Sequence, residues 1–141
     1  MLKFFKPRKK LLDAPIRDNA WLAVDVETTG LDPSKDQLLS IGWVAVEGRD
    51  IVLEESGHLL IRPEREEVSV GESATVHGLT DDMVATGVEA EVAVGKLLEA
   101  LRGRKLLAHY ARMEVGFLDP LCRKYFDARF DAVSYTHLRA H

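Results

Sequence analysis

Two carboxylates separated by one residue, Asp25 and Glu27, are the side chains of this sequence best suited to chemistry. They lie at the end of the apolar run 21–26 (WLAVDV), and the turn-forming segment TTGLDP follows them. Side chains two residues apart in a strand point to the same face, so we expect the two carboxylates to lie side by side. Carboxylates this close repel each other unless a proton or a cation lies between them. A hard cation such as Mg²⁺ prefers such oxygens and keeps positions open for a phosphate.

The segment after the two carboxylates could seat a nucleotide. Thr28, Thr29 and Gly30 offer backbone N–H groups and a conformationally permissive turn. An Asp-x-Glu pair alone is mostly accidental, whereas Asp-x-Glu-Thr-Thr-Gly after a buried strand is a much more specific pattern.

The elements that must position these residues are predicted as strands first and helices later. Apolar, β-branched runs predict strands at 21–26, 38–46, 51–62 (with a break at Gly57 left open) and 105–109. The first three are separated by short turns, which favours an antiparallel arrangement. Helical spacing predicts helices at 89–102 and 111–126.

Two details of the helical regions can be predicted from single residues. Pro120 is expected to break the second helix or to begin a new turn there, with Asp119 as a candidate cap. Thr80 or Asp81 could cap a short helix that follows residues 74–80. Strands followed by helix, strand and helix indicate an α/β protein with a mixed sheet.

The charge distribution argues against binding a polyanion through a broad basic surface. The net charge is −4, yet five of the 19 basic residues lie in the first ten positions, which leaves 14 against 23 acidic residues elsewhere. A body this acidic needs cations between its carboxylates and any phosphate. No apolar run approaches the roughly 18 residues of a membrane span, so no membrane partner is expected. The single cysteine, Cys122, excludes an internal disulfide framework and favours a cytoplasmic location.

Three segments together resemble one family. Residues 24–44 (VDVETTGLDPSKDQLLSIGWV) closely resemble the first motif of the DnaQ-like 3′–5′ exonucleases of the DEDD superfamily, which includes the epsilon proofreading subunit of bacterial DNA polymerase III. Residues 74–84 (ATVHGLTDDMV) are similar to the segment between that family's motifs, and residues 106–122 (LLAHYARMEVGFLDPLC) to its second motif. The resemblance implies an α/β, ribonuclease-H-like mixed sheet flanked by helices, with the first three strands antiparallel and the domain incomplete at its C-terminus. It also implies hydrolysis with two Mg²⁺ (or Mn²⁺) ions.

The resemblance assigns roles to individual residues. Asp25, Glu27 and Glu114 correspond to catalytic metal ligands. The residues implied to bind substrate are Val26, Thr28, Thr29, Gly30, His77, Leu79, His109 and Met113. The sequence departs from the family twice in the second motif, because Glu114 stands where the family has an aspartate and Tyr110 where it has an asparagine.

The family's third motif has no counterpart in this sequence. That motif supplies a general-base histidine and, five residues later, the last metal aspartate, and His137 would need an aspartate one position beyond the chain end. Residues 133–141 resemble translated sequencing-adaptor read-through. We therefore expect a basic flexible leader at 1–17, a partial exonuclease domain at 18–132 and a non-native tail at 133–141. Hydrolysis by this chain is expected to be absent or very weak.

Two functions stay open from the sequence. The first is a metal-dependent 3′–5′ exonuclease, of the histidine subclass, that hydrolyses phosphodiester bonds from the 3′ end of single-stranded DNA or RNA. The alternative is a non-catalytic, exonuclease-like module that binds nucleic-acid ends or a DNA polymerase partner. The intact pair Asp25 and Glu27 favours the enzyme, and the departures at Tyr110 and Glu114 favour the binding module.

Overall fold

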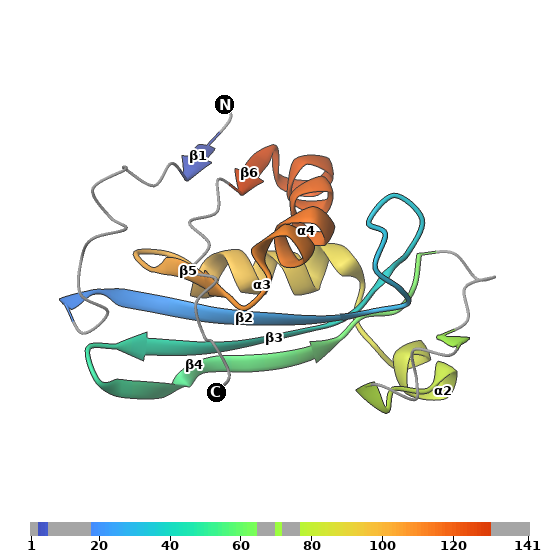
Figure 1. Ribbon diagram of the computed structural model, residues 1–141, viewed down its shortest axis with the longest axis horizontal. Coiled ribbons are helices and arrows are strands. Elements are labelled where there is room, and N and C mark those ends of the chain that lie inside the picture. The colour runs from blue at the N-terminus through green and yellow to red at the C-terminus, as the bar shows by residue number, and fades with distance from the viewer. Residues whose placement is uncertain (1–2, 6–17, 65–69, 72–76, 131–141) are drawn as a thin grey trace.

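A four-stranded sheet forms the centre of the molecule in the computed structural model, which describes residues 3–5, 18–64, 70–71 and 77–130 (Figure 1). The strands are β2 (Ala20–Thr28), β3 (Leu38–Glu47), β4 (Asp50–Leu60) and β5 (Lys105–Ala108). Their order is β4-β3-β2-β5. The first three are antiparallel, and β5 runs parallel to β2. The mixed sheet, its antiparallel beginning and all four predicted strands are therefore confirmed, with shifted ends.

The sheet has one face that packs on helices and one that does not. Helices α3 (Ala90–Ala100) and α4 (Ala111–Phe126) lie together on one side of it in Figure 1. Alternate residues of β2 face these helices, because strand side chains alternate between faces. The buried cluster between sheet and helices includes Leu22, Val24 and Val26 of β2. Asp25 and Glu27 alternate with these residues along β2 and consequently project to the opposite face.

Strand β4 includes Gly57, the residue at which the sequence pattern allows a break in this strand. Gly57 is opposite Trp43 of β3. A Cβ atom on Gly57 would lie only 2.5 Å from Trp43 Cζ2. The glycine therefore makes room for the indole ring, whose Nε1 donates a hydrogen bond to the Glu55 carbonyl at 3.1 Å.

Helix α4 also continues, through Pro120, so the predicted break is wrong. The buried residues Phe117, Leu118 and Cys122 lie on both sides of the proline. Burying an apolar side chain contributes about 1.5–3 kcal/mol, so these three together outweigh the roughly 3 kcal/mol cost of a proline in a helix. Asp119 does not cap a helix. Its carboxylate accepts a hydrogen bond from Phe130 N at 2.9 Å and pairs with Arg123 at 2.7 Å.

Two short strands join the ends of the described chain. Within the predicted leader, the structure describes residues 3–5, which form β1 (Lys3–Phe5). This strand pairs in parallel with β6 (Ala128–Phe130), which directly follows α4. Residues 1–2 and 6–17 of the predicted leader and the predicted tail at 133–141 lie outside the described residues.

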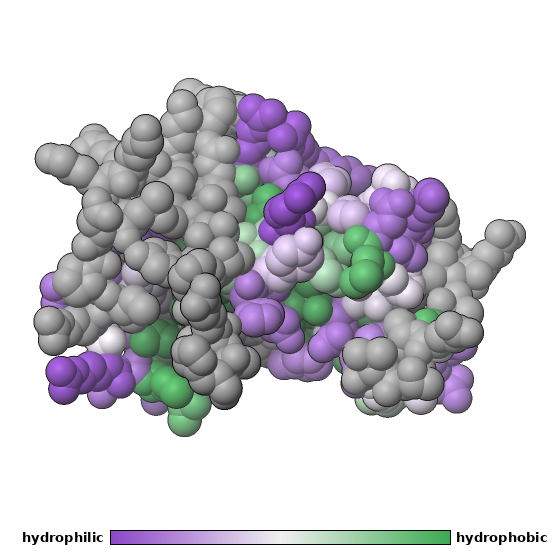
Figure 2. Space-filling model, in the orientation of Figure 1, coloured by the Kyte–Doolittle hydropathy of each residue, from purple (hydrophilic) through white to green (hydrophobic). Residues whose placement is uncertain are grey.

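Hydrophobic residues also reach the surface of the sheet. Figure 2 shows a green patch at the lower left, at the end of the sheet where β3 turns into β4. The large apolar side chains exposed on these two strands are Val44, Ile51 and Leu53. Among the described residues, no helix has the length and apolar character needed to cross a membrane.

Candidate active site

The two carboxylates of the first motif lie near the end of β2, on the face that α3 and α4 leave uncovered. Asp25 is exposed and Glu27 is half-buried. Asp25 is opposite Gly42 of β3, and Glu27 is opposite the buried Ser40. A bulge directly after Glu27 interrupts the regular pairing, and β2 ends one residue later, at Thr28.

The second motif reaches the same place because β5 ends there. Its last paired residue, Ala108, is opposite Val24, so Asp25 has no partner on this side of β2. His109 and Tyr110 follow, both exposed, and α4 begins at the next residue. The Tyr110 carbonyl accepts a hydrogen bond from Glu114 N at 3.3 Å, which closes the first turn of α4. This turn therefore starts beside Asp25.

Glu114 is a buried carboxylate that is not fully satisfied. The residue is only 4% exposed, and its Oε2 atom has no hydrogen-bond partner among the described residues. Burial raises the pKa of Glu114, and the negative charge of Asp25 raises it further, while His109 acts in the opposite direction. The charges of Asp25 and His109 therefore reach the Glu114 carboxyl group, which extends from the first turn of α4. An unpaired buried oxygen beside a second carboxylate is a position that a cation would stabilise.

The Thr-Thr-Gly turn is held by a carboxylate that the sequence prediction missed. Asp36 accepts hydrogen bonds from Thr29 Oγ1 at 3.2 Å and from Asp32 N at 2.9 Å. Thr28 Oγ1 donates to the Gly30 carbonyl at 2.6 Å. A Cβ atom on Gly30 would lie 2.4 Å from Asp36 Oδ2, so only glycine lets this carboxylate approach.

The backbone of this turn is partly occupied by its own contacts. Thr29 N donates to the Gln37 carbonyl at 2.9 Å, and Gln37 N donates to Thr29 Oγ1 at 2.9 Å. Both threonine hydroxyls and the Thr29 amide thus hold the loop. The predicted role of this turn in binding a nucleotide stays a prediction.

The segment between the motifs forms a small second cluster around α2 (Asp81–Ala85). Leu79 is buried there with Leu39, Val70 and Val84. Leu39 precedes Ser40, the partner of Glu27, so this cluster adjoins the carboxylate end of β2.

The start of α2 is fixed by two local hydrogen bonds. Thr80 caps the helix, as predicted, by accepting a hydrogen bond from Met83 N. Leu79 N donates to Nδ1 of His77 at 3.0 Å, which fixes the half-buried imidazole against the turn.

Two other residues with predicted binding roles face the interior. Val26 is buried in the main core, and Met113 is partly buried against that core. The side chain of Val26 therefore serves packing, and only its backbone is placed to meet a ligand.

The chemistry of the donors suits a hard divalent cation. Asp25, Glu27 and Glu114 supply carboxylate oxygens, and the orphaned Oε2 of Glu114 can accept an ion. Within the described ranges, no three His, Cys, Asp or Glu side chains converge closely enough to hold a metal. The structure thus brings Glu114 beside Asp25 but does not show a closed set of ligands.

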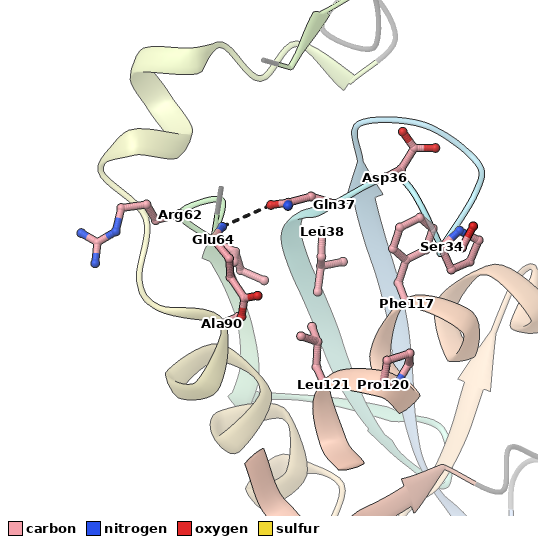
Figure 3. A pocket seen from close by; sticks show the side chains of 12 residues that line it. Ser34, Asp36, Gln37, Leu38, Arg62, Glu64, Ala90, Phe117, Pro120 and Leu121 are labelled. Atoms are coloured by element: carbon pink, nitrogen blue, oxygen red, sulfur yellow. Dashed lines mark hydrogen bonds between the residues drawn. The ribbon is translucent and has the colours of Figure 1, made fainter. Parts of the chain in front are cut away.

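A separate pocket of about 150 Å³ lies behind the Thr-Thr-Gly loop, on the helix side of the sheet (Figure 3). Its floor is apolar, with Leu38, Phe117 and Leu121, and its rim carries Gln37 and Glu64. A hydrogen bond from Glu64 N to Oε1 of Gln37 closes one side at 3.2 Å. The carboxylates of the candidate site are not part of its lining.

Comparison with known proteins identifies the family of this chain. A sequence model described as Exonuclease (RNase_T) matches residues 22–139, including most of the tail that we expected to be non-native. The chain belongs to this exonuclease family. It is 34% identical over 106 residues to a PolC-type DNA polymerase III of Thermotoga maritima, covering 75% of this chain and 8% of that protein. It is 31% identical over 114 residues to the DNA polymerase III subunit epsilon of Haemophilus influenzae, covering 77% and 43%.

Solved structures give the same fold. Exonuclease I of Methylocaldum szegediense aligns with a TM-score of 0.68 and 19% identity over 76% of this chain and 24% of that one. Exonuclease I of E. coli in complex with a dT13 oligonucleotide aligns with a TM-score of 0.64 and 16% identity, covering 77% and 24%. These likenesses confirm the ribonuclease-H-like exonuclease fold. The chain spans less than half the length of these curated relatives.

Proposed function

We propose that this protein is a metal-dependent 3′–5′ exonuclease that removes nucleotides from the 3′ end of a single strand. The observation that carries the proposal is the buried, unpartnered Oε2 of Glu114 beside Asp25, in a chain of the exonuclease family. A structural carboxylate would be expected to find a hydrogen-bond donor when it is buried. An oxygen left free next to a second carboxylate is instead explained by a bound cation.

The roles of the carboxylates follow from their places in the fold. Asp25 and Glu27 extend from a rigid central strand, and Glu114 from the first turn of α4, so packed elements hold all three. We assign two Mg²⁺ (or Mn²⁺) ions to these residues. When bound, such ions lower the pKa of a water molecule and stabilise the charge that develops on the phosphate oxygens. The carboxylates would orient the ions, and the ions would offset the negative charge of the site.

The residues around the carboxylates would position the strand. His77 and Leu79 lie on the α2 cluster next to the Glu27 end of β2, and His109 precedes α4 on the other side of Asp25. A 3′ terminus held between these two sides would present its last phosphate to the carboxylates. Binding of a single 3′ terminus needs only a small contact area, which agrees with the excess of acidic over basic residues in the sequence.

The substrate and partner are proposed from the relatives. Single-stranded DNA is supported by the oligonucleotide complex of E. coli exonuclease I, and a DNA polymerase partner by the polymerase III relatives. RNA stays an alternative substrate, because discrimination of the sugar depends on a few contacts at the 2′ position. We also propose a cytoplasmic location, which the DNA polymerase III relatives support.

The non-catalytic alternative is favoured by one specific observation. Tyr110 places an exposed aromatic ring, and Glu114 a longer carboxylate, where the family has an asparagine and an aspartate. A module of this kind would bind nucleic-acid ends without hydrolysing them.

The test combines binding and hydrolysis with one carboxylate variant. The 141-residue chain is titrated against a 5′-fluorescein-labelled oligothymidylate in Mg²⁺, Mn²⁺ or EDTA, and products are separated on a denaturing gel. We expect metal-dependent binding that Asp25→Asn abolishes and that Asp50→Asn, a matched exposed carboxylate on β4, leaves unchanged. Any hydrolysis should shorten the strand from its 3′ end and disappear in Asp25→Asn. Metal-dependent binding without hydrolysis, or binding that persists in EDTA, would favour the binding module. No binding in any of the three conditions would refute both functions on nucleic acid.

A further inference from the structure

Three strands place His58, Gly42 and Asp25 in one row across the sheet. Gly42 of β3 is opposite Asp25 of β2 in one antiparallel ladder and opposite His58 of β4 in the next. Residues directly opposite each other in antiparallel strands project to the same face. The imidazole of His58 therefore lies on the same uncovered face as the Asp25 carboxylate, and the residue between them has no side chain.

The imidazole lies against Gly42. Its Cδ2 atom is 3.5 Å from the position that a Cβ atom of Gly42 would occupy, which is ordinary van der Waals contact. Neighbouring strands are about 4.8 Å apart, so about 10 Å separates the backbones of β2 and β4.

Nothing in the described part of the chain uses the His58 ring. The residue is exposed, and its side chain forms no hydrogen bond or ion pair with any residue that the structure describes. Glu55 on the same strand, in contrast, pairs with the Arg104 guanidinium. A structural role is therefore not apparent from the contacts of His58, while a neutral or protonated imidazole can donate a hydrogen bond to a phosphate oxygen.

We propose that His58 is a phosphate-binding residue, which donates a hydrogen bond to the nucleic-acid strand whose 3′ end is held at Asp25. This inference rests on the proposed function and extends the site from β2 across Gly42 to β4. Gly42 keeps the row open, because a Cβ atom there would already touch the His58 ring and a larger side chain would crowd it. The motifs of the family resemblance do not include His58, since it lies between the first motif and the His77 segment.

The experiment measures binding of a 5′-fluorescein-labelled oligothymidylate to the full chain by fluorescence anisotropy in Mg²⁺. Loss of one hydrogen bond to a charged phosphate weakens binding about ten- to hundredfold, which we expect for His58→Ala. His58→Gln keeps an N–H donor and should recover part of the affinity. Gly42→Leu, which fills the row, should weaken binding as well. Glu54→Ala, an exposed residue of the same strand, is the matched control and should bind like the wild type.

The outcomes separate this inference from the proposed function. If the wild type shows no Mg²⁺-dependent binding, the proposed function fails. If the wild type binds and His58→Ala binds equally well, only the role of His58 fails. Where hydrolysis is measurable, a raised KM with an unchanged kcat supports phosphate binding, whereas a lowered kcat with an unchanged KM overturns it. Equal unfolding midpoints in urea for His58→Ala and Glu54→Ala exclude a folding defect as the cause.

Discussion

Replacing Gly30 with alanine is expected to dismantle the hydrogen bonds that hold the loop after the carboxylate pair. The new Cβ atom would lie 2.4–2.7 Å from three atoms of the Asp36 carboxyl group, so this group must move. Gly30 does not have a positive φ, which means that alanine suits the backbone and the clash alone carries the effect. The displaced carboxylate loses its bonds from Thr29 Oγ1 and Asp32 N.

The magnitude follows from those two bonds. At a partly buried site each contributes about 1–1.5 kcal/mol, near the lower limit for bonds to a charged group. Alanine offsets about 0.5–1 kcal/mol of this loss by restricting the unfolded chain. We therefore expect Gly30→Ala to lower the free energy of unfolding by about 2 kcal/mol. Urea denaturation followed by circular dichroism measures this as a lower midpoint at constant slope.

A double-mutant cycle with Asp36→Ala makes the reasoning refutable. Asp36→Ala removes the atoms that the alanine would meet, so Gly30→Ala should then be neutral or stabilise by about 0.5–1 kcal/mol. The coupling free energy between the two positions should reach about 2–3 kcal/mol. An equal cost of Gly30→Ala in both backgrounds would show that the carboxylate contact does not hold this loop.

Three further predictions concern the carboxylates and the sheet. The raised pKa of Glu114 means that its carboxyl group binds a proton more tightly in the folded chain than in the unfolded chain. The free energy of unfolding therefore falls as the pH rises from the ordinary pKa of 4.5 through the raised pKa of the folded chain. Glu114→Gln should therefore gain stability over the wild type on going from about pH 4 to about pH 7 in EDTA, measured by urea unfolding; a constant difference would contradict this. Mg²⁺ should raise the wild-type Tm and leave that of Asp25→Asn unchanged, which differential scanning fluorimetry measures. Gly57→Ala should lower the free energy of unfolding by about 1–3 kcal/mol, because the new Cβ atom would meet the rigid Trp43 ring. An unchanged midpoint of urea unfolding would refute the close contact between Gly57 and Trp43.

The spacing of apolar residues along the chain predicted the main helices and strands. Contacts between residues far apart in the sequence decided where these elements continue or end. The period of apolar residues gave α4 its observed bounds, 111–126, and the run at 21–26 located β2. Pro120 misled the prediction because the packing that holds α4 around it comes from the sheet, which no local rule contains. The strand β6 is only three residues long, too short for a periodic signal.

The candidate site was predicted in its residue types more than in its geometry. The spacing of Asp25 and Glu27 was enough to place both on one face of a strand. The burial of Glu114 and the row that joins His58 to Asp25 depend on how β4, β3, β2 and α4 meet, which spacing along the chain does not encode. Asp36 gave one weak signal, a carboxylate six residues after Gly30 in the same turn-forming segment.

The pairing of β1 with β6 has a consequence for the order in which the molecule folds. Lys3 is opposite Ala128, so the two strands belong to opposite ends of the described sequence. Closing so long a loop costs chain entropy, which the contacts within each short strand do not offset. Pairing between strands this far apart in the sequence therefore forms late in folding. During synthesis β1 therefore stays without its partner strand until the segment after α4 leaves the ribosome. Slow amide exchange in residues 3–5 would thus mark chains in which the rest of the domain has already folded.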